Sequence, residues 1–194
     1  MACDNFLWFP EGAKGGLLKF GSDKPLGETT DKWFSTMNAL ECTSISFGVS
    51  QAETTGSGTT GASAGKAKFE EFTIEKFIDL ASVPLYVACC AGAHYPTVML
   101  AIRKAGGANL IYLQYIFRRV FVTGINWSGG GGEEAPKETI KFKYGAMGIQ
   151  YVQQLSTGGE GKKMQAKWTA VKNKPTLDVD DLSGSPEFIG STQM

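Results

Sequence analysis

The sequence predicts a mainly β protein, an antiparallel β-barrel of two packed sheets with one short flanking α-helix and a long glycine-rich extended loop. Many short segments alternate apolar and polar residues, as half-buried strands do. Glycine-rich turns separate these segments, and glycine makes up 25 of the 194 residues. A single short run of helix formers lies among the strands, and this combination favours an antiparallel barrel or sandwich.

The central stretch, residues 72–122, is the part around which the other strands are expected to assemble. Alternation places Phe72, Ile74 and Lys76 on one face of its first strand. Further strands are expected after Pro96 and over residues 112–122, with a glycine turn at residues 106–107 between them.

A short helix is expected between the first two of these strands, over residues 85–91. Ser82 precedes it as the expected N-cap, Pro84 lies in its first turn, and Gly92 follows its end. A serine cap, an early proline and a terminal glycine are the usual start and stop signals of a helix.

The segment 39–50 is expected to be a half-buried strand with one small, polar face. Its larger apolar residues alternate with small ones, so one face is buried and the other faces water. The residues of the polar face are Ser44, Ser46, Gly48 and Ser50.

Residues 51–68 consist largely of glycine, threonine, serine and alanine and show no apolar periodicity. We expect an extended loop here, because such a segment cannot pack a core of its own. Long loops inside a compact domain are usually either functional or disordered, and both interpretations stay open.

The remaining strands are expected over residues 138–144, 147–155 and 164–171, and they complete one domain over residues 1–174. A chain of 194 residues is long enough for one domain with a sizeable core. Residues 175–194 are polar and acidic and contain two prolines, so we expect a flexible tail.

The chain has 19 basic and 19 acidic residues, so its formal net charge is zero. The balanced charge therefore does not indicate binding to nucleic acid or to an anionic membrane. The first residues show no basic region and no long apolar run, so neither a signal peptide nor membrane insertion is expected. The four cysteines are expected to be buried free thiols, because their spacing matches no zinc signature.

No catalytic, metal or cofactor site is expected, and the chain is predicted not to be an enzyme. His94 is the only histidine, and its place after the helix favours a structural role over a dyad with Cys89 or Cys90. Residues 56–61 fit the spacing of a nucleotide-binding glycine motif, but no amphipathic helix follows to present its N-terminus to a phosphate.

A series of motifs runs through roughly residues 28–174. They are Ser46-Phe-Gly-Val-Ser-Gln51, Phe72-Thr-Ile-Glu-Lys-Phe-Ile-Asp79, His94-Tyr-Pro96, Leu100-Ala-Ile-Arg-Lys-Ala-Gly-Gly107, Ser128-Gly-Gly-Gly-Gly-Glu133, Glu138-Thr139 and Tyr151-Val-Gln-Gln154. In identity and order they resemble the haemolysin-coregulated protein (Hcp) family, the tube proteins of bacterial type VI secretion. Two departures are an insertion over about residues 10–26 and the tail beyond residue 174.

The resemblance implies a structural subunit that forms homohexameric rings, which stack into the inner tube of a type VI secretion system. A contracting sheath expels the tube, and small effector proteins travel in its lumen. The implied partners are other copies of the chain, the sheath, spike and baseplate components, and small effectors. The resemblance also implies synthesis in the bacterial cytoplasm, then secretion to the extracellular space or a target cell.

Two candidate surfaces follow from the resemblance. Ser46 is expected to face the lumen by motif match, and strand alternation adds Ser44, Gly48 and Ser50 as candidate effector contacts. The extended loop is the candidate ring-stacking arm. Its candidate residues are Gln51, Thr54, Thr55, Gly56, Gly58, Gly61, Gly65 and Lys66. The alternative function is a monomeric β-barrel module that binds a small ligand at the Ser46 face or the barrel mouth.

Overall fold

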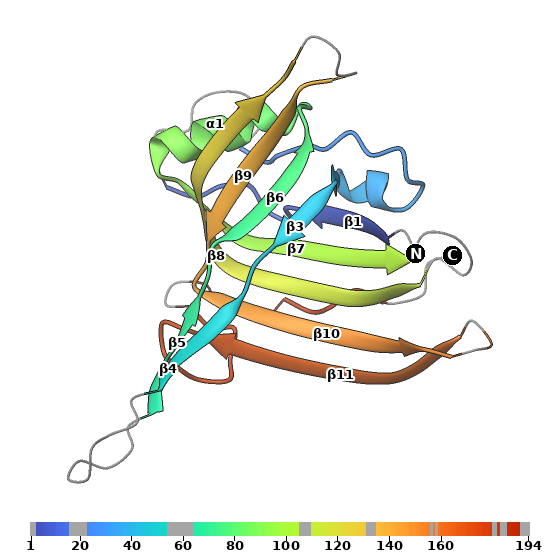
Figure 1. The fold of residues 1–194 in the computed structure, drawn as a ribbon, viewed down its shortest axis with the longest axis vertical. Coiled ribbons are helices and arrows are strands. Elements are labelled where there is room, and N and C mark those ends of the chain that lie inside the picture. The colour runs from blue at the N-terminus through green and yellow to red at the C-terminus, as the bar shows by residue number, and fades with distance from the viewer. Residues whose placement is uncertain are drawn as a thin grey trace.

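The computed structural model describes residues 3–15, 23–53, 64–104, 110–130, 135–155, 157, 159–179, 182 and 186–190. The strands in these ranges are β1 (Cys3–Trp8), β2 (Leu40–Cys42), β3 (Ser44–Ser46), β4 (Val49–Glu53), β5 (Ala64–Phe69), β6 (Phe72–Phe77), β7 (His94–Lys104), β8 (Ile111–Ser128), β9 (Lys137–Lys143), β10 (Ala146–Gln154) and β11 (Glu160–Thr169). The helices are the 3-10 helix η1 (Phe34–Met37) and the α-helix α1 (Ser82–Ala91). The predicted mainly β class with one short α-helix is confirmed (Figure 1).

Strand β8 belongs to two layers of antiparallel strands. Its first half pairs with β7 and β10, which places it in a layer ordered β2-β1-β7-β8-β10-β11. Its second half pairs with β9, which starts a layer ordered β8-β9-β6-β3. Arg119, with φ of 52°, lies where β8 leaves β10 and turns toward β9 (Figure 1). The two layers therefore enclose a common interior.

The interior between the layers is filled with aromatic and aliphatic side chains. Phe72 of β6 stacks on Phe117 of β8 with ring centroids 4.5 Å apart, and Phe142 of β9 lies 5.4 Å from Phe72. Leu85 and Ala88 of α1 close this core and are fully buried. Burial of these apolar faces is the main force that holds the layers together.

Helix α1 begins three residues earlier than predicted and stops where predicted. Gly92 adopts φ of 63° and ends the helix, as the sequence indicated. The expectation that Ser82 is the N-cap is wrong, because Ala81 occupies that position and Ser82 is the first helical residue. The helix has no side-chain cap hydrogen bond, and Asp79 instead fixes the turn before it, since its Oδ1 accepts a hydrogen bond of 2.9 Å from the Ala81 amide.

A buried ion-pair network explains why Ser82 has another role. Lys76 shares the face of Phe72 and Ile74, as the alternation of β6 predicted. It is 1% exposed, and its Nζ lies 2.9 Å from Glu138 Oε1 and 2.5 Å from Asp79 Oδ1. The Ser82 hydroxyl donates to Glu138 Oε1 at 2.6 Å, and Trp127 Nε1 donates to Glu138 Oε2 at 3.0 Å. The network thus connects β6, β9, β8 and the first turn of α1.

A second apolar cluster covers the outer side of the first layer. Phe6 and Trp8 of β1 pack there with Phe34 of η1, and the chain end adds the buried residues Leu177 and Val179. Residues 175–194 are predicted to form a flexible polar tail, but the described part of this segment packs against the sheet through these apolar residues. The domain boundary near residue 174 stays a prediction, as does the extent of the insertion at 10–26, of which residues 16–22 lie outside the described ranges.

We expect Lys76→Met to destabilise the protein by about 3–5 kcal/mol, because it leaves the Glu138 carboxylate buried without its cation. Urea denaturation followed by circular dichroism measures this loss. Lys76→Met combined with Glu138→Leu should recover most of it, since no charge is then buried alone. Lys162→Met, at an exposed site, is the control and should change stability by less than about 0.5 kcal/mol. An equal loss in the single and double variants would contradict a role for charge.

Candidate assembly surfaces

The outer side of the β3-β6-β9 layer is polar, as predicted for the Ser46 face. Ser44 and Ser46 are exposed on β3, where they pair with Glu75 and Thr73 of β6. Thr73 in turn pairs with Lys141 of β9. Alternation explains this face, because the intervening residues of each strand point into the core.

Gly48 and Ser50 do not extend this face. The single strand predicted for residues 39–50 is divided into β2, β3 and β4, and β3 ends at Ser46. Glu70 lies across the chain here: its backbone amide donates to the Gly48 carbonyl at 2.9 Å, and its exposed side chain reaches to 2.5 Å from where a Cβ on Gly48 would lie. Ser50 belongs to the separate β4–β5 sheet, opposite Lys68. The role of all four residues as lumen contacts stays a prediction.

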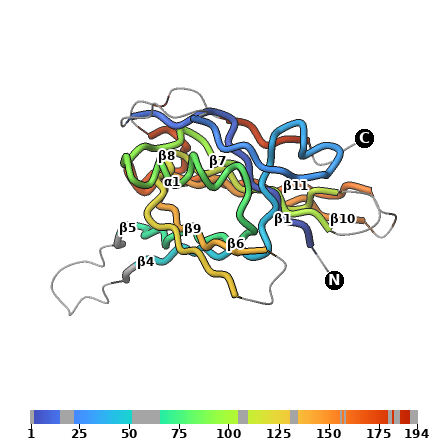
Figure 2. Tube along the Cα trace, turned by 90° about the horizontal axis from the view of Figure 1, so that it is seen from above, coloured from blue at the N-terminus to red at the C-terminus, as the bar shows by residue number. Residues whose placement is uncertain are grey.

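The predicted extended loop is a two-stranded arm where it is described. β4 and β5 pair antiparallel, with Gln51 opposite Ala67, and the arm points away from the two layers (Figures 1 and 2). Lys66 is exposed on β5. Backbone pairing gives the arm a defined direction that composition alone did not predict. The candidate residues Thr54, Thr55, Gly56, Gly58 and Gly61 lie outside the described residues, and the structure places Gly65 in β5.

Two aromatic residues hold the base of the arm. Phe47 precedes β4 and contacts the rings of Tyr115 at 4.7 Å and Phe72 at 5.3 Å, both edge to face. Phe69 ends β5 and stacks on Tyr144 at 5.1 Å. These contacts anchor both strands of the arm in the core, so the arm is positioned by the body of the protein.

An exposed apolar patch lies beside α1, and the sequence did not predict it. It consists of Ile78, Val83, Tyr86 and Trp127, which with Ser82 line a shallow groove of about 260 Å³. Tyr86 is 49% exposed, and its ring lies 5.8 Å from that of Trp127. The spacing of Val83 and Tyr86 indicates one helical face, but only the fold shows that this face is uncovered. We call these four residues the α1 patch.

A second apolar patch lies on the β10–β11 ribbon. Tyr151 and Met164 are directly opposed across the two strands, and Met164 is 74% exposed. Trp168 lies on the same face of β11, four residues further along. Among the described strands β11 pairs with β10 alone, so its outer edge is open. We call Tyr151, Met164 and Trp168 the ribbon patch.

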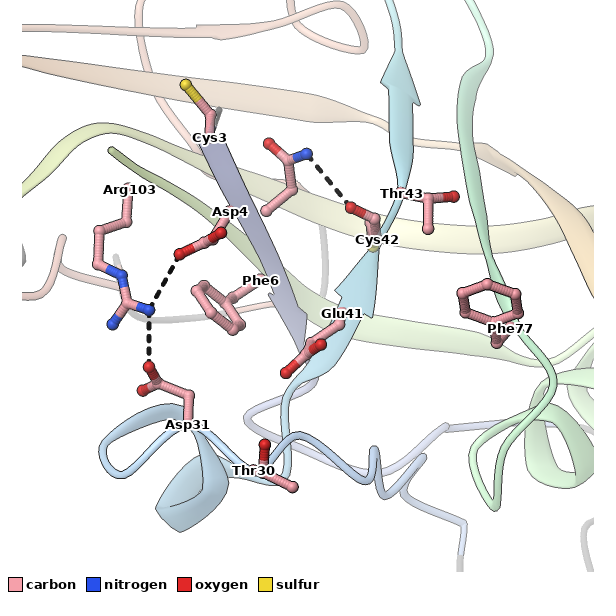
Figure 3. Close-up of a pocket in the computed structure, with 11 residues that line it drawn as sticks. Cys3, Asp4, Phe6, Thr30, Asp31, Glu41, Cys42, Thr43, Phe77 and Arg103 are labelled. Carbon is pink, nitrogen blue, oxygen red and sulfur yellow. Dashed lines mark hydrogen bonds and ion pairs between the residues drawn. The ribbon is translucent and has the colours of Figure 1, made fainter. Parts of the chain in front are cut away.

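A polar cavity of about 370 Å³ opens between β1, β2 and residues 30–31 (Figure 3). Arg103 crosses its side, with Nη2 at 2.7 Å from Asp31 Oδ2 and 3.2 Å from Asp4 Oδ2. The guanidinium also lies 4.9 Å from the centre of the Phe6 ring. Asp4 and Asp31 are thus already paired, and a ligand in the cavity would compete with these ion pairs.

The carboxylate of Asp31 is held in its charged form. Burial by itself would raise its pKa, but hydrogen bonds from the Phe34 and Trp33 amides and from Arg103 outweigh this and lower the pKa below 3.8. A lowered folded-state pKa means that Asp31 stabilises the fold at neutral pH and loses this contribution as the pH falls through that folded pKa. Through its ion pair with Arg103, the charged Asp31 carboxylate connects the segment before η1 to β7.

Residues considered for catalysis have structural surroundings. His94 begins β7, where its backbone exchanges hydrogen bonds of 2.7 and 3.0 Å with Lys14, and its ring lies 5.3 Å from that of Phe121. Within the described ranges, no group of three or more His, Cys, Asp or Glu side chains is placed to hold a metal ion. Across the same residues, no helix has the length and apolar character needed to cross a membrane.

Known proteins share both sequence and fold with this chain. The model of the family described as "Type VI secretion system effector, Hcp" matches residues 13–151. Protein hcp1 of Pseudomonas aeruginosa is 31% identical over 110 residues, which are 56% of this chain and 68% of that protein. A solved structure of a type six secretion system protein is 30% identical with a TM-score of 0.76, over 90% of this chain and 100% of that one. The crystal structure of Hcp1 from Salmonella typhimurium is 28% identical with a TM-score of 0.67, over 91% and 100% of the two chains.

The fold and its exposed apolar patches define a structural protein of the β class. The chain belongs to the Hcp family, because the family model matches more than half of its length. Members of this family are type VI secretion tube proteins, not enzymes, so the predicted family, the tube role and the prediction that the chain is not an enzyme are confirmed.

The four cysteines are free thiols, as expected, but two of them, Cys3 and Cys90, are exposed rather than buried. Burial raises the pKa of Cys42 to about 12, which leaves almost no thiolate at neutral pH. We expect maleimide to label Cys3 and Cys90 readily in the native protein, and Cys42 at least about 100-fold more slowly. Peptide mass spectrometry after timed labelling measures this order. Labelling of Cys42 in native buffer at the rate seen in urea would contradict it.

Proposed function

We propose that this chain forms homohexameric rings that stack into the inner tube of a type VI secretion system. Sheath contraction expels the tube, with small effectors carried in its lumen. The observation that supports self-assembly most directly is the presence of two separate apolar patches on different elements. The α1 patch lies on the helix side of the second layer, and the ribbon patch lies on the projecting β10–β11 hairpin (Figure 1).

Two different patches favour a heterologous contact between copies. In such a contact the α1 patch of one copy meets the ribbon patch of the next, and a suitable rotation closes the ring. Exposed apolar surface of this kind usually marks an interaction site in a protein that otherwise covers its core. Met164, which is 74% exposed, and Trp127, which is 54% exposed, have the most apolar surface to gain from burial in their patches.

The polar outer face of the β3-β6-β9 layer supports the lumen assignment. Ser44 and Ser46 share this face with Thr73, Glu75 and Lys141, so it presents hydroxyls and both signs of charge. A water-filled channel requires such a surface, and an apolar face would close it by association. Small effectors would contact the lumen through these side chains.

The arm supports the stacking of rings. Its strands are anchored at Phe47 and Phe69, and it extends beyond the layers that build the subunit (Figure 2). An anchored arm can lie along a neighbouring ring without disturbing its own core. Each contact orders a glycine-rich segment and is therefore weak, but six contacts per ring act together.

The remaining partners follow from the tube role. The tube would contact the sheath along its outside and spike and baseplate components at its ends. Passage through the apparatus would deliver the chain from the bacterial cytoplasm to the extracellular space or a target cell.

Negative-stain electron microscopy and light scattering of the purified chain test the proposal. We expect six-fold rings with a central hole and a mass of six 20.8 kDa chains. A monomer at every accessible concentration would overturn the ring proposal for this chain. It would favour the alternative, a β-barrel module that binds a small ligand.

Single charges in either patch should weaken the rings. We expect Tyr86→Asp or Met164→Glu to raise the dissociation constant of the ring at least about tenfold, because each would bury an unpaired charge. Light scattering over a concentration series measures this, and circular dichroism checks the fold. Lys162→Glu, on the same ribbon but outside the patch, is the control. Unchanged rings in both patch variants would exclude this interface.

The arm should matter for stacking more than for ring closure. We expect deletion of residues 56–65 to leave the subunit folded and the rings present, with shorter or absent tubes. Electron microscopy of the deleted and full chains at equal concentration compares tube lengths. Loss of rings with stacking retained wherever rings remain would contradict this assignment.

A further inference from the structure

The C-terminal segment, residues 174–190, is described over residues 174–179, 182 and 186–190, and these parts lie on the outer face of the β1-β7-β8-β10 layer. It leaves β11 through a turn in which the Lys174 and Thr169 backbones are bonded. Its first anchor is Leu177 with Val179, both buried in the second apolar cluster. Its second anchor is Phe188 with Ile189, which pack against the same cluster. Two apolar anchors thus attach an otherwise polar segment.

Glycines in and beside β10 make room for both anchors. A Cβ on Gly148 would lie 3.3 Å from Phe188 Cζ and 3.5 Å from Leu177 Cδ1. A Cβ on Gly145 would lie 3.0 Å from Val179 Cγ1. The surface under the segment is therefore hollowed by missing side chains, and larger residues there would push the segment away.

Two buried polar side chains form hydrogen bonds with the backbone of the segment. Gln114 is 1% exposed, and its amide donates to the Ile189 carbonyl at 2.9 Å and accepts from the Ile189 amide at 3.1 Å. Arg118 is 4% exposed and donates to the Leu182 carbonyl at 3.1 Å and to the Thr97 hydroxyl at 2.7 Å. The pair of bonds at Gln114 imitates the pairing of a neighbouring strand.

These contacts have the character of peptide recognition. Extended peptides are commonly bound through their backbone groups, while pockets for a few side chains provide selectivity. Without the segment, Gln114 would lose its two bonds to Ile189 and face water, and the apolar side chains of the second cluster that the segment covers would be exposed. The outer face is therefore completed by an occupant with apolar side chains and with a free backbone amide and carbonyl at this position.

We propose that the outer face of β7, β8 and β10 is a peptide-binding groove and that residues 174–190 are its intramolecular ligand. The same segment of a second copy is the ligand in trans, and it enters when the first is displaced. In the intact chain the tethered segment has an effective concentration in the millimolar range, so it excludes the competitor. Exchange between neighbouring copies rests on the proposed ring, whereas the groove itself does not.

The test uses the full chain with a protease site inserted after Lys172, in the exposed turn before the segment. The protein folds intact, and cleavage then removes only the covalent tether, so that the segment can exchange with an excess of added peptide. A fluorescein-labelled peptide of residues 174–194 serves as the probe, and fluorescence anisotropy measures its binding. We expect saturable binding of one peptide per cleaved chain and no binding to the uncleaved chain.

Matched variants separate specific from general contact. Gly148→Phe in the groove, or Leu177→Asp in the peptide, should weaken binding at least about tenfold. Gly130→Phe is the control, because a Cβ there meets nothing within 4 Å. The proposal is wrong if the cleaved chain keeps its β spectrum and does not bind the probe, or if the Asp peptide binds equally well. It is also wrong if the barrel unfolds when the segment leaves, since the segment is then part of the core. None of these measurements depends on ring formation, so their outcome tests the groove separately from the proposed ring.

Discussion

The structure depends on one constraint, that β8 serves as a strand of both layers. Its first half must fit β7 and β10, and its second half must fit β9, so its side chains alternate between different surroundings along 18 residues. The change of partner falls at Arg119, whose positive φ turns the strand. A strand shared in this way fixes the angle between the layers, and the packing of Phe72 against Phe117 follows from it.

The shared strand also explains why the outer surfaces of the two layers differ. Outside the second layer the residues are short and polar, as at Ser46 and Thr73, and water can cover them. Outside the first layer they are apolar, as at Trp8 and Ile116, and η1 and the C-terminal segment cover them. The interior side of the same layer continues past the core onto the β10–β11 ribbon, where Met164 is left exposed. The polar outer surface can thus remain in contact with water, whereas the apolar surfaces are stabilised by a covering segment or partner.

Alternation and turn signals predicted the strands well because they are local. The face on which Lys76 lies followed from its position after Phe72 and Ile74, but its burial and its partner Glu138, 62 positions away in the sequence, were not predicted. The break between β3 and β4 was missed, because alternation does not show where the chain changes its pairing partner from β6 to β5. The pairing of the arm was missed because small residues carry almost no periodic signal. The α1 patch was missed because exposure depends on which neighbours the fold supplies.

The C-terminal segment was misjudged for a physical reason that also applies to the Lys76 network. Composition ranks a segment by its average polarity, whereas its position depends on a few residues that meet a complementary surface. Leu177 and Val179 are two apolar residues in an acidic stretch, and the Gln114 amide that holds Ile189 is remote in sequence. In both places a buried polar side chain on a strand is hydrogen-bonded by a segment distant in sequence. Such groups specify which segment docks, while the apolar contacts supply most of the attraction.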